Sequence, residues 1–185
     1  MHPDEVLEFW FGADPPAVRD YWFRKSDAFD DAVRSRFGAT IEAALSGALD
    51  EWGGTPEGTL ALIVLLDQFT RNVFRDTPRA FAGDAAALGH ARRLVGAAAD
   101  RRLTTLQRWF VYMPFEHSEE LIDQYESLRL FGELAREGLD APLDWARRHF
   151  EVVLRFGRFP HRNEILGRAS TAEELEFLKG PGSRF

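Results

Sequence analysis

The apolar residues of this chain recur mostly at the three- and four-residue spacing of a helix. The densest stretch follows Thr55 and Pro56, where the run from Leu60 to Phe69 places apolar side chains on nearly every side. A threonine before a proline is a common helix start, and an apolar surface all round is typical of a helix buried at the centre of a domain. A buried strand is the alternative for so short a run, but its length and flanking residues favour a helix.

Capping residues and breaks divide the rest of the chain into further helices. Gly12 and Gly157 are expected to end two of them, because glycine readily adopts the left-handed conformation that terminates a helix. The predicted helices span residues 3–11, 26–45, 55–69, 77–94, 105–113, 118–135, 141–156 and 170–178. No segment is convincing as a strand, so the predicted fold class is all-α.

Two of these helices carry specific expectations. The helix of residues 105–113 should stop at Pro114, because proline cannot continue the backbone hydrogen bonding of a helix. The next helix should take Ser118 as its N-cap. It should bury one apolar side, formed by Leu121, Ile122, Tyr125, Leu128 and Ala135.

Short connections between many helices imply antiparallel neighbours, which predicts a helix array or bundle. With 185 residues the chain has the length of about one domain, so residues 1–185 are expected to form a single helical domain. No clean sequence repeat divides it.

Composition narrows the function classes. A net charge of -7 disfavours nucleic-acid binding, which needs a basic surface. The longest uninterrupted apolar run, Leu60 to Leu66, is too short to cross a membrane, and the first residues lack the pattern of a signal peptide. The predicted location is therefore cytoplasmic. The absence of cysteine excludes disulfides and thiolate chemistry on this chain.

The charges are unevenly distributed along the sequence. Arginine dominates residues 145–168, whereas residues 114–126 hold several carboxylates and no Lys or Arg. These two segments are expected to face each other. Arginine suits two-point contacts with carboxylate or phosphate groups, so the same segment is a candidate anion site.

A polar cluster ends the most apolar helix. Asp67 and Arg71, and likewise Gln68 and Asn72, are four residues apart, so each pair shares a helix face. These residues are candidates for ligand binding at the wall of a cavity. The alternative is an ion pair and an amide contact that complete a core helix.

His149 is expected to point inward. On a helical wheel it lies among Trp145, Val152 and Phe156, while the neighbouring charged residues take the opposite side. A buried imidazole needs hydrogen-bond partners. It is a candidate general base, metal ligand or substrate contact, and the alternative is a satisfied core histidine.

The segment from Phe156 to Asn163 has the densest chemistry. Its two phenylalanines are expected to anchor a loop from which polar groups project. Those groups are Arg158, His161, Arg162 and Asn163. The two arginines are candidates to clamp a carboxylate or phosphate, or else they pair with the acids of residues 116–126 and lock the fold.

His117 lies in a further acidic motif, Glu116 to Glu119. Together with His149, His161 and nearby carboxylates it forms a candidate acid–base or mixed metal site, but the spacing matches no established metal pattern. No metal and no cofactor are predicted, since the phosphate-binding and dinucleotide-binding glycine motifs are also missing. Ser118 is better explained as a helix cap than as a nucleophile.

Several of these motifs occur together in one known family. The motifs are Leu66–Asn72, Met113–Glu119, Phe156–Asn163 and Leu166–Thr171. Together with Val6–Gly12, they resemble the bacterial "domain of unknown function 924" family over essentially the whole chain. The resemblance implies a curved array of antiparallel helix pairs like that of the tetratricopeptide superfamily. It implies no activity and no catalytic residues.

The candidate residues are expected to converge on one pocket that binds a small anionic ligand. Two alternatives stay open. One is a tetratricopeptide-like module that binds a protein or an acidic peptide. The other is a hydrolase-type or metal-assisted enzyme that uses His117, His149 or His161. The fold class does not decide between them, because fold does not fix function.

Overall fold

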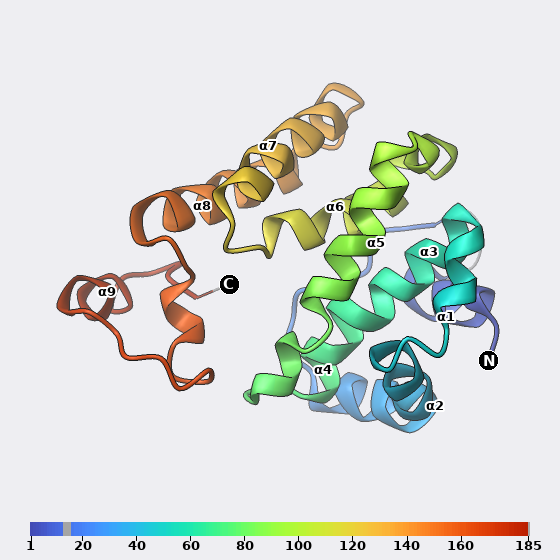
Figure 1. Cartoon of the computed structure of the whole chain (residues 1–185), viewed down its shortest axis with the longest axis horizontal. Coiled ribbons are helices and arrows are strands. Elements are labelled where there is room, and N and C mark those ends of the chain that lie inside the picture. The colour runs from blue at the N-terminus through green and yellow to red at the C-terminus, as the bar shows by residue number, and fades with distance from the viewer. Residues whose placement is uncertain (13–15, 185) are drawn as a thin grey trace.

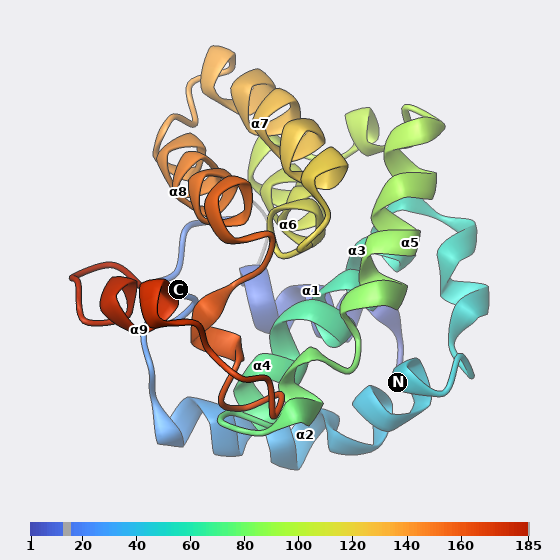
Figure 2. The same cartoon turned by 60° about the vertical axis from the view of Figure 1, so that its left-hand side comes forward.

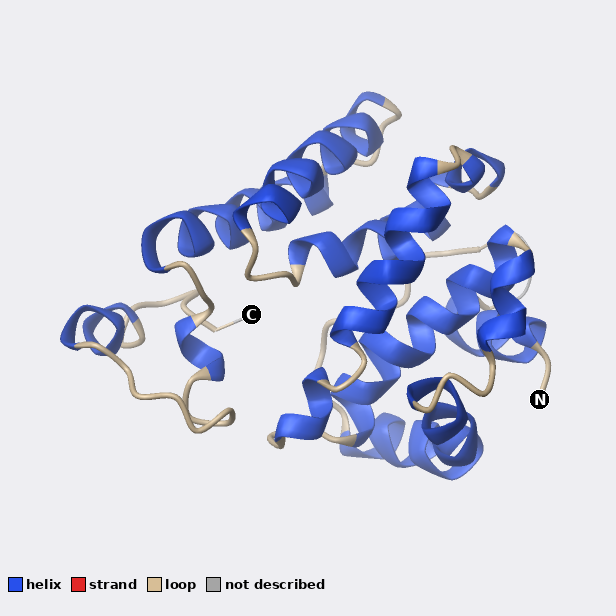
Figure 3. Cartoon of the chain, in the orientation of Figure 1, coloured by secondary structure: helices blue, strands red, loops and turns tan. Residues whose placement is uncertain are grey.

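The computed structural model describes residues 1–12 and 16–184. Within these ranges the chain consists of helices joined by turns and contains no strand, as Figure 3 shows. The helices are α1 (Pro3–Phe11), α2 (Asp27–Leu45), α3 (Pro56–Ile63), α4 (Thr70–Val73), α5 (Asp84–Gly96), α6 (Thr105–Glu116), α7 (Leu121–Arg136), α8 (Ala141–Phe156) and α9 (Ala172–Phe177). Short 3₁₀ turns are η1 (Asp50–Gly54), η3 (Pro78–Phe81), η4 (Ala99–Arg102) and η5 (Pro160–Arg162), and η2 (Val64–Phe69) is a π-helix. The all-α prediction is thus confirmed.

Most predicted helix boundaries are confirmed by their caps. The Ser26 hydroxyl accepts a hydrogen bond from the Phe29 N–H at 3.3 Å, and the Thr55 hydroxyl accepts one from Gly58 at 3.0 Å. Thr171 forms the expected capping box at the start of α9, and Gly157 ends α8 with φ 67°. Each cap satisfies backbone groups that a helix end leaves without a partner.

The central apolar helix is buried as predicted, but it is not α-helical throughout. Every side chain from Leu60 to Thr70 is buried, among helices α1, α2, α5 and α6. Between α3 and α4 the backbone changes to the π-helix η2, in which hydrogen bonds span five residues instead of four. The Thr70 hydroxyl donates to the Leu66 carbonyl at 2.7 Å inside this stretch.

The helix predicted for residues 77–94 is divided in two. A 3₁₀ turn, η3, comes first, and α5 begins only after Gly83. Gly83 lies directly against the central helix, because a Cβ built there would be 2.2 Å from the Leu66 carbonyl oxygen. The chain bends at this contact, and the bend interrupts the helix.

The prediction that Pro114 ends its helix is wrong. Helix α6 continues through Pro114 to Glu116, and both residues are buried. Proline removes one backbone hydrogen bond, and here it stands close to the end of the helix, where the burial of Phe115 outweighs that loss.

The predicted buried side of α7 is wrong for Leu121, Ile122 and Tyr125, whereas Leu128 is partly buried against the core. Ile122 is 72% exposed, Tyr125 53% and Leu121 38%. The core-facing side holds Gln124, Ser127, Leu130, Phe131 and Leu134 instead. Two of these residues are polar, so the sequence pattern favoured the more apolar outer stripe.

The start of α7 departs from the prediction as well. Glu120, not Ser118, is the N-cap residue. Ser118 still supports this end of the helix, because its hydroxyl accepts from the Glu120 N–H at 3.2 Å and donates to Asp123 at 2.7 Å.

Helices α5 to α8 pack as successive neighbours, and α7 lies antiparallel to α8. Tyr125, near the start of α7, contacts Phe150, near the end of α8, with 5.1 Å between the ring centroids. Figures 1 and 2 both show these two helices side by side at the edge of the molecule. Beyond α8 the chain turns back through η5 toward α9, which places residues 158–163 beside the rest of the fold.

The core is rich in aromatic side chains. Trp10 of α1 contacts Phe110 of α6 edge to face at 5.5 Å, and Phe37 of α2 contacts Phe69 at 5.0 Å. Such pairs add to the free energy of burying their large surfaces. No helix in the described part of the chain is long and apolar enough to cross a lipid bilayer.

Candidate functional site

The π-helix places Asp67 at the centre of a buried ionic cluster. Its carboxylate is fully buried and lies 3.1 Å from Arg71 Nη1 and 2.7 Å from His117 Nδ1. The Gln68 amide donates to the same carboxylate at 2.5 Å. Burial alone would raise the pKa of Asp67, but Arg71 and His117 outweigh it and hold the pKa well below its usual range. Asp67 is therefore ionised at neutral pH.

Arg71 joins this cluster to helix α5. Its guanidinium donates to both carboxylate oxygens of Asp84, at 2.8 and 3.0 Å, and to the Asp67 carbonyl at 2.6 Å. Asp84 is the first residue of α5, where the helix dipole favours a negative charge. The predicted pairing of Asp67 with Arg71 is confirmed, and Arg71 binds two carboxylates of its own chain.

Arg162, from η5, is a buried arginine with few partners. Its side chain is 8% exposed, and its nearest carboxylate is Asp84, with Nη1 3.5 Å from Oδ2. Its Nε has no hydrogen-bond partner in the described part of the chain. The guanidinium lies against two rings, 4.8 Å from Phe81 and 4.5 Å from Phe159. Burial, followed by the positive charge of Arg71, lowers the pKa of Arg162 to about 10.

Two histidines, each beside a carboxylate, lie next to Arg71 and Arg162. The ring centroids of His117 and His149 are 6.2 Å apart. His149 Nδ1 is 2.9 Å from both Glu116 Oε1 and the Trp145 carbonyl oxygen. Burial lowers the pKa of His117, and the Asp67 carboxylate offsets this only in part. The predicted inward position of His149 is confirmed, because it is 6% exposed.

Phe159 completes a closed circuit of contacts. Its ring lies 5.5 Å from His149 and 5.7 Å from His161, in addition to its contact with Arg162. We call this circuit the Arg/His ring, and its members are Asp67, Arg71, Asp84, His117, His149, Phe159 and Arg162. His161 stands beside it, and burial together with nearby positive charge lowers the pKa of His161 to about 3.

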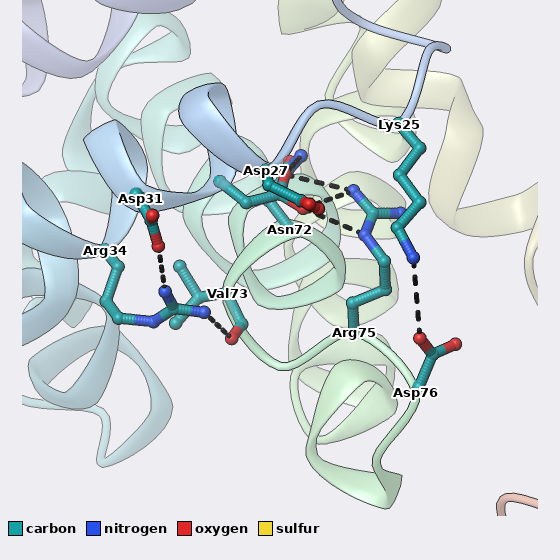
Figure 4. Close-up of a pocket in the computed structure, with 9 residues that line it drawn as sticks. Lys25, Asp27, Asp31, Arg34, Asn72, Val73, Arg75 and Asp76 are labelled. Atoms are coloured by element: carbon teal, nitrogen blue, oxygen red, sulfur yellow. Dashed lines mark hydrogen bonds and ion pairs between the residues drawn. The ribbon is translucent and has the colours of Figure 1, made fainter.

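Asn72 does not join the ring, although its spacing in the sequence grouped it with Asp67. Its amide donates to Asp30 of α2 at 2.7 Å, and Arg75 binds the same carboxylate. These residues border a separate surface pocket of about 240 Å³, drawn in Figure 4. The expected amide contact between Gln68 and Asn72 is also absent among the described contacts, because Gln68 bonds to Asp67.

Arg158 and Asn163 hold the C-terminal segment together. Arg158 makes a two-point contact with Glu174 of α9, at 2.6 and 2.8 Å, and Asn163 donates to the same carboxylate at 3.3 Å. Arg158 thus pairs within the chain itself, but its partner is Glu174 and not an acid of residues 116–126 as the alternative predicted. The expectation that all candidates meet in one pocket is wrong for Arg158 and Asn72.

The acidic segment of residues 114–126 does meet the arginine-rich segment, as expected. Arg168 binds Glu119 through two nitrogens, at 2.6 and 2.9 Å. Glu119 also accepts a hydrogen bond from the Phe159 N–H at 2.8 Å. This carboxylate therefore fixes the loop that carries Phe159 and Arg162 against α6 and α7.

Sequence reasoning missed two members of the site, Asp84 and Phe81. Neither belongs to a dense polar motif, and both reach the ring from the segment around Gly83. No signal marked Asp84, because the predicted helix of residues 77–94 placed it in a helix interior, whereas it is the first residue of α5. Among the residues that the structure describes, no group of three or more His, Asp or Glu side chains is placed to hold a metal ion.

Comparisons with known proteins give the family but no activity. A model of a bacterial protein family of unknown function, DUF924, matches residues 6–182. The fold is similar to that of a solved protein of unknown function, ATU0120 from Agrobacterium tumefaciens, with 39% identity and a TM-score of 0.87. The match covers 96% of this chain and 97% of that one. A search of curated proteins finds no match. The chain therefore belongs to the DUF924 family of bacterial proteins.

Proposed function

We propose that this protein binds a small anionic ligand, through a carboxylate or phosphate group, at Arg162 of the Arg/His ring. The observation that carries the proposal is the incomplete pairing of this buried guanidinium. Its Nε has no hydrogen-bond partner in the described chain, and its nearest carboxylate, Asp84, is 3.5 Å away. A buried cation is costly to leave underpaired, so such a group is a natural receptor for an anion.

The other arginines of the site supply the contrast. Arg71 and Arg158 each make a two-point contact with a carboxylate of the chain itself. Arg162 is buried more completely than either of them, yet it makes no such contact. Because arginine binds carboxylates and phosphates with two parallel hydrogen bonds, its spare donors fit a ligand of that kind.

The surroundings of Arg162 would strengthen this binding. Phe81 and Phe159 cover the guanidinium and keep water from it, which raises the strength of electrostatic contacts. His161 adds a group that becomes positive when it takes up a proton. An anion bound beside it would favour that protonated form.

A second candidate function is acid–base catalysis on the bound anion. It is favoured by the histidine–carboxylate pair of His117 and Asp67, 2.7 Å apart. His149 differs, because its Nδ1 bonds to the Trp145 carbonyl, while Glu116 Oε1, 2.9 Å away, has no hydrogen-bond partner in the described part of the chain. A carboxylate on Nδ1 fixes the orientation of an imidazole and leaves Nε2 to exchange a proton with a substrate. In this case His117 would be the acid–base group and Asp67 the residue that positions it.

The relation to the tetratricopeptide superfamily belongs among these proposals. The succession of neighbours from α5 to α8, with α7 antiparallel to α8, supports it. In an array of that kind, the Arg/His ring would lie where the C-terminal segment of the chain folds back onto the preceding helices.

The anion proposal is tested by ligand-induced thermal stabilisation. Inorganic phosphate, phosphorylated metabolites and dicarboxylates are screened against the wild type, Arg162→Met and the control Arg155→Met. A ligand at about 100 times its Kd should stabilise the wild type by about 2.7 kcal/mol. Arg162→Met should abolish this effect, and Arg155→Met should retain it, because Arg155 pairs with an exposed Glu173 away from the ring.

The Arg162 variant should fold, since replacing an underpaired buried cation by an apolar side chain is often neutral or stabilising. Two results would contradict the proposal. One is equal stabilisation of the wild type and Arg162→Met by the same anion. The other is the failure of every anion to stabilise the wild type at millimolar concentration.

A further inference from the structure

A groove runs along the outer seam between α7 and α8, away from the Arg/His ring. It has a volume of about 570 Å³ and is lined by Leu128, Gly132, Ala135, Arg136, Leu143 and Arg147. Four of these residues belong to α7 and two to α8, which lie side by side in Figure 1. The floor is apolar, and the two arginines stand at its rim.

The apolar surface continues beyond the groove along both helices. One turn before Leu128 lies Tyr125, 53% exposed, and then Ile122, 72% exposed. On α8 the corresponding residue is Leu154, 55% exposed. The α7 side chains belong to the stripe that the sequence pattern predicted to be buried. Contiguous exposed apolar surface of this kind marks interaction sites in soluble proteins.

Gly132 adds to the open space of the groove. It lies in the interior of α7, and a Cβ built on it would meet no atom within 4 Å. Packing inside the chain therefore does not require a glycine, and glycine weakens a helix interior relative to alanine. Its effect on the surface is to leave room in the floor of the groove.

The charges at the rim indicate the chemistry of the occupant. Arg136 makes no ion pair with any described residue, and Arg147 pairs only with Asp144, where both side chains are exposed. An exposed pair of this type is worth little and exchanges readily. The rim is thus basic on a chain whose net charge is -7.

A second copy of the chain fits this surface poorly. A two-fold dimer brings the same patch together from both sides. The residues that line the groove include no carboxylate, so each copy would present Arg136, and Arg147 already paired with Asp144, to the same two arginines of the other copy. A partner that carries its own acidic residues avoids this repulsion.

We propose that the α7–α8 groove binds an acidic amphipathic helix of a partner protein. Two packed helices leave a groove that accepts the apolar stripe of a third, spaced at i, i+3 or i+4, and i+7. Apolar side chains of the partner fill the space above Gly132. Its Asp or Glu residues pair with Arg136 and Arg147.

The test uses two synthetic fluorescent peptides of helical design with identical leucine positions. One carries Glu beside the leucine stripe, and the other carries Lys. Fluorescence anisotropy measures their binding to the wild type, Gly132→Leu, the double variant Arg136→Glu/Arg147→Glu and the control Gly38→Leu. Gly38 is the matched control, because it too lies inside a helix, α2, where an added Cβ would meet no atom within 4 Å.

The Glu peptide should bind the wild type saturably and the Lys peptide at least about tenfold more weakly, which is about 1.4 kcal/mol. Gly132→Leu should weaken the Glu peptide by a similar factor by filling the groove, while Gly38→Leu leaves its Kd unchanged. The double charge reversal should invert the preference between the peptides. A melting temperature for Gly132→Leu no lower than that of the wild type confirms that it folds.

Three results would overturn the proposal. The first is the absence of saturable binding of the Glu peptide to the wild type. The second is equal binding of both peptides, or binding that Gly132→Leu does not change. The third is a wild-type dimer in light scattering that Gly132→Leu makes monomeric, because the occupant is then a second copy. None of these outcomes bears on Arg162, which takes no part in the groove.

Discussion

His161 illustrates how strongly the fold controls single titratable groups. Burial, followed by the charges of Arg162 and other neighbours, lowers the pKa of His161 to about 3. In an unfolded chain a histidine titrates near 6.5. The folded protein therefore keeps this side chain neutral at a pH where the unfolded chain would protonate it.

This difference predicts a dependence of stability on pH. Because the unfolded state binds the proton more readily, the free energy of unfolding should fall as pH decreases below about 6.5. His161→Gln should remove part of this loss, about 1–2 kcal/mol between pH 7 and pH 5. Urea denaturation of both proteins at a series of pH values measures the effect.

Near pH 8 the imidazole is neutral in both states, so the difference between variant and wild type should no longer change with pH. An identical pH dependence of the two proteins at acidic pH would contradict the buried, neutral His161. The same linkage predicts that anion binding beside Arg162 tightens as pH falls.

The sequence predicted part of this residue-level picture. Helical spacing was enough to place His149 inward and to pair Asp67 with Arg71, because both depend on one helix alone. The partners of Asn72 and Arg158 were not predictable in this way. Asp30 and Glu174 belong to other helices, and only the folded chain determines which carboxylate reaches Asn72 and which reaches Arg158.

At the level of elements, the contact between η2 and the start of α5 positions the ring. Gly83 allows the two backbones to approach so closely that a Cβ would lie 2.2 Å from the Leu66 carbonyl oxygen. The next residue is Asp84, which binds Arg71 and lies nearest to Arg162. The short distance between the backbones of Gly83 and Leu66 thus sets the position of the ion pair between Asp84 and Arg71.

Gly83→Ala should therefore destabilise the protein by about 2–3 kcal/mol, because neither backbone can move without repacking the core. It should also weaken anion binding by displacing Asp84. Gly96→Ala, at the last residue of α5, is the control, since its Cβ would meet no atom within 4 Å. Chemical denaturation checks both variants, and equal stabilities would refute the proposed role of Gly83.

Element boundaries were predicted well where a cap defines them and less well where packing does. Thr171 and Gly157 provide local hydrogen bonds or conformations that sequence reveals. Whether α6 continues through Pro114, and which side of α7 is buried, depend on the parts of the chain that pack against these helices. Gln124 can lie on the core side of α7, because its amide donates hydrogen bonds to the carbonyls of Glu116 and Ser118.

On the scale of the whole molecule, the two ends of the chain are held by different forces. The N-terminal helices share one large apolar core, which also takes in residues of α6, α7 and α8. In its described residues, the segment after α8 shares a small apolar cluster, around Val153 and Phe159, with the end of α8. Its main attachments are polar, with Glu119 as the link to Arg168 and to the Phe159 backbone.

Glu119→Gln should therefore loosen residues 158–170 without affecting α3. Loss of a charge-assisted contact costs about 1–3 kcal/mol, so amide hydrogens there should exchange about tenfold faster or more. Hydrogen exchange with mass spectrometry measures both segments. Glu126→Gln, which changes an exposed ion pair within α7, should leave both unchanged. Uniform acceleration across the chain would count against a locally held segment.

The π-helix has a consequence for the ancestry of the site. Its hydrogen bonds span five residues, so Val64–Phe69 holds one residue more than an α-helix with the same number of turns would need. Loss of a single codon there would return the stretch to an uninterrupted α-helix and leave α3 and α4 in nearly the same relative orientation, because only the surplus residue is removed. Arg71 of α4 would still face Asp84, whereas Asp67, inside the stretch, would change its position on the helix. A one-residue gap at this stretch in a descendant chain would thus be the heritable mark of a lineage that keeps the fold and rearranges the ring around Asp67.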